Sequence, residues 1–333
     1  MSNDNFRSNR FLGKEAVMRR TVWNGLMVAC ACAFSLTVTP GSEAYEEMVV
    51  AEGGSLSGTV HLHGKIPMPK GYNLTTVPDP IYCGRISDGN GWRLLQPFDV
   101  GPKGEFRRVV VYLAGIDKGK PFGAYTPPKL EAIDCRFDPF INLVRDHHDV
   151  VVVNMDPAFH DIQAYETSNL GPRVLFNVPL PISKRYPREA GLSAHFHKHY
   201  EGTTVTQPVR MTKDRKIFTM QCGFHPYMES WALVADHPYY ALADNEGRFQ
   251  LTDIPPGTYT VKVWHPYIRD EIERTITIEP KKQTSVDLTV EAPTGRLYAN
   301  QMVENAYVRY SITEDVQSQI VPTLEKQRLN EGQ

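Results

Sequence analysis

Residues 216–235 read KIFTMQCGFHPYMESWALVA, which is two apolar segments joined by a short loop. The segments from Lys216 to Met220 and from Ser230 to Ala235 have the length and composition of β-strands. The loop between them carries Cys222, His225 and Met228. A thiolate, an imidazole and a thioether form the soft ligand set that suits copper as it changes between Cu(I) and Cu(II). The stretch therefore predicts two strands connected by a copper-binding loop.

The rest of the chain up to about residue 295 also indicates strands and turns. Gly 24 and Pro 25 are together somewhat high for 333 residues, which favours a β-rich protein. The segment Val150 to Val153 is apolar on both faces, so we expect it to be a central strand. No convincing long helix precedes residue 296. These features predict an all-β fold, with a β-sandwich as its architecture.

A fourth metal ligand has to come from elsewhere in the chain, and His160 is the best candidate. It follows the central strand Val150 to Val153 and a turn that contains Asp156 and Pro157. A ligand placed just past a rigid strand is held firmly, as a preorganised metal site requires.

The two ligand segments resemble those of the cupredoxins. The likeness is carried by Cys222-x-x-His225-Pro226-x-Met228, whose spacing is similar to the amicyanin and pseudoazurin loops, and by Asn154-x-Asp156 before His160. It extends over about residues 56–236. The resemblance implies a Greek-key β-sandwich that holds one type 1 (blue) copper ion per chain. It also implies that Cys222 is the thiolate ligand, that His160 and His225 are equatorial ligands, and that Met228 is the axial ligand.

Two features depart from the cupredoxin pattern. Asp161 follows the first histidine, where many cupredoxins have an asparagine that ties the ligand loops together. A carboxylate at this place can accept hydrogen bonds from the loop backbone but cannot donate one. The spacing from His160 to Cys222 is also long (222 − 160 = 62), and we expect the insertion near residues 167–206 to cover or extend the site. By the same resemblance, electrons would pass through an exposed edge of His225 near an apolar surface.

Residues 237–292 predict a second, smaller β-sandwich. The segments from Tyr259 to Trp264 and from Thr284 to Val290 alternate between polar and apolar residues. The part from 237 to 290 resembles the carboxypeptidase regulatory-like (prealbumin-like) family, on the residues Asp244, Gly247, Phe249, Pro255, Gly257, Tyr259 and Val261. This resemblance implies a fold and no catalysis. Residues 45–236 are then the copper unit, and residues 293–333 form a polar C-terminal tail.

The N-terminal 44 residues predict export from the cytoplasm. Arg19 and Arg20 precede an apolar run that ends in small residues before Ala44, as in a secretory signal peptide. An uncleaved membrane anchor and a lipid anchor at Cys30 are alternatives. We therefore expect a periplasmic or otherwise extracytoplasmic protein that contacts a membrane only through such an uncleaved signal or lipid anchor.

Cysteine counting supports a metal-bound thiolate. Cleavage of the signal removes two of the five cysteines and leaves Cys83, Cys135 and Cys222. The economical arrangement is a Cys83–Cys135 disulfide, with Cys222 kept as the metal ligand. A Cys222 that is merely buried is the alternative.

A second metal site is a further candidate. His195, His197 and His199 occupy alternate positions, so they would share one face if the segment were a strand. In a loop, they would be solvated side chains. The formal net charge of −2 gives no indication of a nucleic-acid partner.

The sequence favours an exported blue-copper electron carrier without enzymatic activity, whose partners are redox proteins such as a cytochrome or a dehydrogenase. Two other functions stay open. One is a structural or partner-binding subunit of an envelope electron-transfer complex, which would include a sandwich that retains these residues without functional copper. The other is copper storage or delivery through the His195–His199 segment. A zinc site is less favoured, because methionine is a poor zinc ligand.

Overall fold

The computed structural model describes residues 45–297, apart from residues 85, 89–90, 168–170, 194–195, 214, 270–271 and 296. The predicted signal peptide and almost all of the predicted tail lie outside these residues. The regular secondary structure of the described part is almost entirely β-strand, so the all-β prediction is confirmed. It contains one short α-helix, α1 (Pro80–Gly84), and two 3-10 helices, η1 (Leu74–Thr76) and η2 (Ala190–Leu192). None of its helices is long and apolar enough to span a membrane.

Two sheets form the sandwich that carries the predicted ligands. One has the order β12 (Arg173–Leu180), β11 (His160–Glu166), β14 (Ile217–Gln221), β15 (Glu229–Ala235) and β9 (Ile141–Arg145). The other has the order β13 (Val205–Pro208), β10 (Asp149–Asn154), β7 (Lys129–Ala132) and β8 (Phe137–Asp138). Their buried side chains form one core that includes Leu130, Val150, Val152, Ile162, Phe218 and Met220. The strand β10 lies between β7 and β13, as expected from its apolar residues on both faces.

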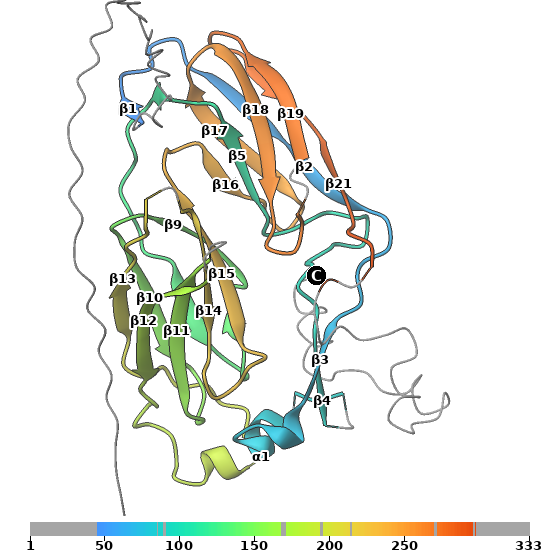
Figure 1. The fold of residues 1–333 in the computed structure, drawn as a ribbon, viewed down its shortest axis with the longest axis vertical. Coiled ribbons are helices and arrows are strands. Elements are labelled where there is room, and N and C mark those ends of the chain that lie inside the picture. Colours follow the sequence, from blue (N-terminus) through green and yellow to red (C-terminus); the bar gives the residue numbers. More distant parts are fainter. Residues whose placement is uncertain are drawn as a thin grey trace, which may run out of the picture. The chain divides into compact units, whose positions relative to one another are not determined.

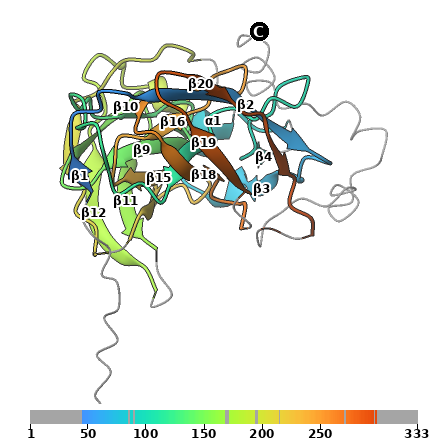
Figure 2. The same ribbon diagram turned by 90° about the horizontal axis from the view of Figure 1, so that it is seen from above.

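A second sandwich contains the remaining long strands. One sheet has the order β16 (Tyr240–Leu242), β5 (Val110–Ala114), β18 (Gly257–Trp264) and β19 (Ile272–Ile278). The other has the order β17 (Arg248–Ile254), β2 (Gly54–His63) and β20 (Gln283–Ser285), and β21 (Leu288–Glu291) also pairs with β2. Figure 2 shows β2 and β20 in one layer, with β18 and β19 in the other.

The predicted boundary at residue 236 is wrong, because both sheets of the second sandwich depend on strands from the N-terminal part of the chain. The strand β2 pairs with β17, β20 and β21, while β5 lies between β16 and β18. Leu56, Val60 and Val111 are fully buried in this core together with Phe249 and Val261. Neighbours in sequence usually pair, so the sequence favoured a split into consecutive units. Here the chain leaves the second sandwich after β5 and returns to it at β16.

Short elements between β2 and β5 lie outside both sandwiches. The strands β3 (Lys70–Asn73) and β4 (Trp92–Leu95) pair with each other, and α1 and η1 lie on the connection between them (Figure 1). The strands β1 (Glu46–Glu47) and β6 (Lys118–Gly119) form a separate two-stranded pair. The connection that carries α1 contacts one of the predicted ligands, His225.

The shared sandwich makes a testable prediction for a fragment that ends at residue 236. Such a fragment lacks every partner strand of β2 and β5, so Leu56 and Val111 would lose their apolar surroundings. We expect the backbone amides of residues 54–63 and 110–114 to exchange with deuterium at least 100-fold faster than in a chain spanning residues 45–297, a loss of about 3 kcal/mol of local stability. Equal protection of these amides in the two chains would show that the predicted boundary holds.

Candidate metal centre

The antiparallel pairing of β11 and β14 brings the two predicted ligand segments together. His160 is the first residue of β11, and Cys222 directly follows β14. Because the two strands run in opposite directions, with Gln163 opposite Gln221, the start of one meets the end of the other. The loop from Cys222 to Met228 is closed by backbone hydrogen bonds, in which Cys222 N donates to Met228 O at 3.1 Å and Met228 N donates to His225 O at 2.8 Å.

Three side-chain atoms converge at this end of the sheet. Nδ1 of His160 lies 3.2 Å from Nδ1 of His225, and the Cys222 sulfur lies 4.0 Å and 3.6 Å from them, respectively. The centre of the circle through these atoms is about 2.1 Å from each, and bonds from zinc to imidazole nitrogen and thiolate sulfur are about 2.0–2.3 Å in proteins. The three residues therefore fit a trigonal site for a first-row transition metal.

The fourth predicted ligand, Met228, ends the same loop, and its backbone is hydrogen-bonded to Cys222 and His225. Its side chain is fully buried and belongs to the same core cluster as Cys222. His160 and His225 are also fully buried, and Cys222 is 2% exposed. The site is consequently closed to water, which strengthens every electrostatic interaction inside it.

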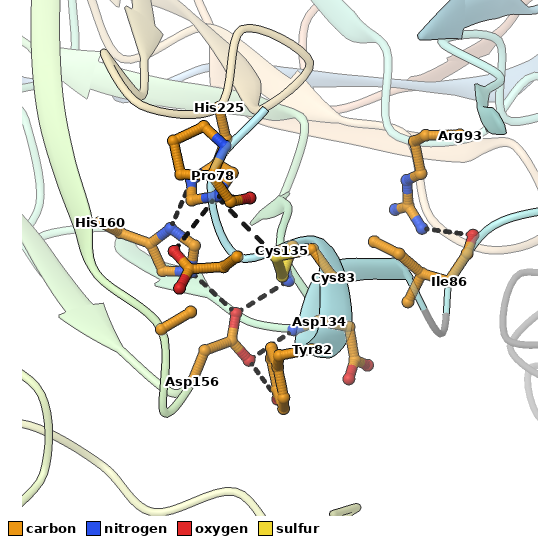
Figure 3. Close-up of a disulfide and its surroundings, with 12 residues drawn as sticks. Pro78, Tyr82, Cys83, Ile86, Arg93, Asp134, Cys135, Asp156, His160 and His225 are labelled. Carbon is orange, nitrogen blue, oxygen red and sulfur yellow. Dashed lines mark hydrogen bonds and ion pairs between the residues drawn. A yellow bond between two sulfur atoms is a disulfide. The ribbon is translucent and has the colours of Figure 1, made fainter. Parts of the chain in front are cut away.

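Hydrogen bonds at the far side of each ring orient the two imidazoles. Nε2 of His160 donates to Oδ2 of Asp156 at 3.0 Å, and Nε2 of His225 donates to the carbonyl of Pro78 at 3.2 Å (Figure 3). A ring that holds its proton on Nε2 presents a lone pair on Nδ1. Both Nδ1 atoms are thereby prepared to bind a cation, as outer-shell partners do at metal sites.

Asp156 is a buried carboxylate whose role the sequence did not reveal. Its oxygens accept hydrogen bonds from the hydroxyl of Tyr82 and from the backbone N–H groups of Asp134 and Cys135, in addition to His160. The spacing Asn154-x-Asp156 was the sequence feature that could have indicated this role. The side chain of Asn154 holds the turn, since its Oδ1 accepts a hydrogen bond from the backbone N–H of Asp156 at 2.9 Å.

The Cys83–Cys135 disulfide is formed as predicted, and Cys222 is the free cysteine of the described residues. The disulfide joins α1 to the turn whose backbone holds Asp156 (Figure 3). Pro78, the hydrogen-bond partner of His225, lies just before α1. The disulfide thus links the segment that contacts His225 to the turn that holds Asp156, the partner of His160.

The expected exposed edge of His225 is absent, and that prediction was wrong. Besides the Pro78 carbonyl, Oδ2 of Asp79 lies 3.6 Å and the Cys83 sulfur 3.9 Å from Nε2 of His225. These residues belong to the connection between β3 and β4, which is far from His225 in the sequence. The sequence of the ligand loop therefore gives no indication of them. They cover the ring edge that would otherwise face solvent.

Asp161 ties the two ligand segments together in the way expected of a carboxylate. Its Oδ1 accepts a hydrogen bond from the backbone N–H of Gly223 at 2.6 Å, and its Oδ2 accepts one from the Gln163 side chain at 2.8 Å. The residue that departs from the cupredoxin pattern therefore still restrains the loop next to Cys222.

Burial and charge displace the pKa values around the site in opposite directions. Burial alone would lower the pKa of His160, but hydrogen bonds with Asp156 and Cys222 outweigh it and raise the pKa to about 9. Burial and the nearby His160 charge lower the pKa of His225 to about 4. Burial would raise the pKa of Asp156, but its hydrogen bonds with His160 and His199 hold it well below the usual range. In the metal-free protein, the pair of rings thus holds one positive charge beside an ionised Asp156, and a bound cation would take the place of the proton on Nδ1 of His160.

The predicted second site is not assembled among the described residues. His195 lies outside them, and His197 is exposed. His199 instead lies between two carboxylates, with Nε2 3.2 Å from Asp134 and Nδ1 3.6 Å from Asp156, and its Nδ1 donates to the carbonyl of Met155 at 3.0 Å. The described residues 196–201 form no strand, so alternate positions do not share a face.

Comparisons with known proteins give partial similarities. A family described as polysaccharide lyase family 4, domain II, has a model that matches residues 225–286. No curated protein matches the chain. The match concerns a different family from the carboxypeptidase regulatory-like domains, so that resemblance stays a prediction.

Similar solved structures are cupredoxins over about a third of the chain. A purple cupredoxin from Nitrosopumilus maritimus is 16% identical, covers 32% of this chain and 99% of its own, and has a TM-score of 0.23. Amicyanin from Paracoccus versutus is 10% identical, with coverages of 38% and 97% and a TM-score of 0.22. Auracyanin from Roseiflexus castenholzii is 13% identical, with coverages of 34% and 99% and a TM-score of 0.21. Similarity this low carries no conclusion about the metal, which rests on the geometry above.

His199 provides a test of the charge network by pH. Hydrogen bonds to Asp134 and then to Asp156 raise its pKa to about 10, above the value of 6.5 for a free side chain. The resulting stabilisation is complete below about pH 6.5 and is lost as the pH rises through about 10. In metal-free protein, we expect the free energy of unfolding to fall between pH 6 and 9.5 by about 2 kcal/mol more than in His199→Gln.

The matched control for this titration is His197→Gln, which changes an exposed histidine of the same segment. It should follow the unmodified protein at both pH values in urea unfolding. Identical pH dependence in all three proteins would contradict the proposed ion pairs of His199.

Proposed function

We propose that the chain binds one copper ion as a type 1 centre and carries single electrons between redox proteins. The observation that supports this most is the triangle of two Nδ1 atoms and one sulfur, whose centre lies at bonding distance from all three. A thiolate with two imidazoles and a nearby thioether is the ligand set of blue-copper electron-transfer sites. Met228, which is fully buried at the end of the same loop, would supply the thioether.

The residues around the centre favour electron transfer over ligand exchange. When bound, copper supplies a one-electron couple. The hydrogen bonds from both Nε2 atoms and the bond from Gly223 to Asp161 fix the ligand positions in advance. Fixed ligands in a water-free pocket need little rearrangement when the charge changes, which lowers the barrier to electron transfer.

The burial of the site supports a carrier without enzymatic activity. His160, Cys222, His225 and Met228 are each 2% exposed or less, which gives a substrate no direct access to the centre. Copper storage or delivery has weaker support, since the histidines 195–199 form no shared site in the described part of the chain. We further propose an extracytoplasmic location, which suits a protein with a structural disulfide.

A visible spectrum tests the copper proposal. The copper-loaded protein should show an intense thiolate-to-Cu(II) absorption band with one copper per chain, and Cys222→Ser should lose the band entirely. His197→Gln, in the exposed part of the histidine segment, should retain both band and stoichiometry. Absence of the band in the unmodified protein, or its persistence in Cys222→Ser, would rule out a type 1 centre.

The reduction potential tests the role of Asp156. Its negative charge on the far side of His160 favours Cu(II) over Cu(I), because the imidazole becomes a stronger donor. Asp156→Asn should raise the potential by about 60 mV, which is a tenfold change in the ratio of the two affinities.

Asp253→Asn is the control for this measurement, because that carboxylate is 65% exposed and belongs to the second sandwich. Protein-film voltammetry of both variants would give the comparison, with the visible band confirming an intact site. A potential that is unchanged or lowered in Asp156→Asn would contradict the assigned role.

A further inference from the structure

Because His225 is covered, electrons need a route to the centre other than its ring edge. The ligand segments do reach the surface, but through the residues that lie between the ligands. In the loop 222–228, Gly223, Phe224 and Pro226 are exposed while the other four residues are not. In the other segment, Phe159 is exposed directly before His160.

Phe159 and Phe224, each next to a histidine ligand in the sequence, form an exposed aromatic pair. Their rings are 4.8 Å apart in an edge-to-face arrangement at 87°, and the two residues are 43% and 42% exposed. Each phenylalanine is bonded through one peptide group to an imidazole ligand. The aromatic pair is thus the exposed apolar surface with the shortest covalent connection to both rings.

A basic segment packs against the turn that precedes Phe159. The described residues of this segment, 181–193 and 196–200, pack on the turn before His160, since the Tyr186 hydroxyl donates to the carbonyl of Met155 at 2.5 Å and a Cβ built on Gly191 would meet Pro157 O at 2.8 Å. The exposed charges of this segment in the described residues are Lys184, Arg185, Arg188 and Lys198, against the single acid Glu189. No ion pair of the described residues involves these four cations, although Arg185 stacks on the ring of Tyr200. The segment also exposes Ile182 and Leu192.

We infer that the aromatic pair and the exposed cations of the basic segment (Lys184, Arg185, Arg188 and Lys198) form the docking surface for an acidic electron-transfer protein. The inference rests on the proposed electron-carrier function. An apolar centre beside a rim of one charge is the composition of a transient protein interface. Complementary rim charges increase the rate of encounter, and the dependence of that rate on salt reports them.

The covering of His225 explains why the surface lies here. Pro78, Asp79 and the disulfide-linked helix occupy the approach to the ring edge of that ligand. The long insertion predicted near 167–206 supplies the basic segment, which packs on the turn before His160 and also contacts α1 through η2.

Stopped-flow reduction of the Cu(II) protein tests this surface. The probe is reduced plant-type [2Fe–2S] ferredoxin, an acidic one-electron carrier, and the loss of the visible copper band gives the second-order rate constant. For the unmodified protein, we expect this constant to fall at least tenfold between about 20 mM and 300 mM salt, as screening of steering charges requires. The Phe159→Ser/Phe224→Ser variant should react at least tenfold more slowly at low salt.

Two further variants separate charge from apolar contact. Lys184→Glu/Arg188→Glu should lose the salt dependence and slow the reaction at low salt. Val174→Ser is the matched control, because Val174 is 54% exposed on β12 but pairs with Tyr165, far along β11 from His160. It should react within twofold of the unmodified protein.

The outcomes distinguish this inference from the function on which it rests. A protein without a copper band would overturn both. An intact band and potential with rates unchanged in the aromatic and charge variants would overturn the docking surface alone. The docking surface would also be overturned if the protein sedimented with phosphatidylserine vesicles only when Phe159 and Phe224 were present, while the rate constant with ferredoxin did not depend on them. That result would assign the surface to membrane binding.

Discussion

The buried carboxylate of Asp156 is the constraint on which the metal centre depends. An ionised group with no exposure is stable only because several donors replace water around it, and here they come from Tyr82 in α1, from the backbone of Asp134 and Cys135, and from His160. These donors belong to segments that are distant in sequence. The carboxylate therefore positions a ligand and holds the disulfide-linked helix against the sandwich at the same time.

The same arrangement closes the centre. The connection that includes Pro78 and α1 is fixed to the sandwich by the Cys83–Cys135 disulfide and covers the ring of His225. A covered histidine protects the site from water and from small ligands, which is consistent with a carrier. It also removes the ring edge as a contact for partners and leaves the residues between the ligands at the surface. The closed centre and the proposed docking surface at Phe159 and Phe224 thus have one structural cause.

The sequence allowed the metal centre to be predicted better than the division of the chain. Cys222 and His225, which the structure brings together with His160, could be predicted because one loop holds both, and His160 because a strong apolar strand precedes it. The partner strands of β2 and β5 could not be identified, since pairing between Val111 and Val263 depends on chain topology and leaves no local pattern. The burial of His225 could not be predicted for the same reason, because Pro78, which contacts its ring, is 147 residues away in the sequence. The second metal site predicted at His195, His197 and His199 was overestimated, because alternate positions share a face only in a strand and the described residues 196–201 form none.

The central claim is that His160, Cys222 and His225 together bind copper. X-ray absorption at the copper edge of the loaded protein tests it most directly, because the method counts and identifies the ligand atoms. We expect two imidazole nitrogens at about 2.0 Å and one sulfur at about 2.2 Å from the copper ion, close to the bond lengths of other transition-metal sites with these ligands. A first shell of nitrogen and oxygen atoms alone, with no sulfur at bonding distance, would contradict the account.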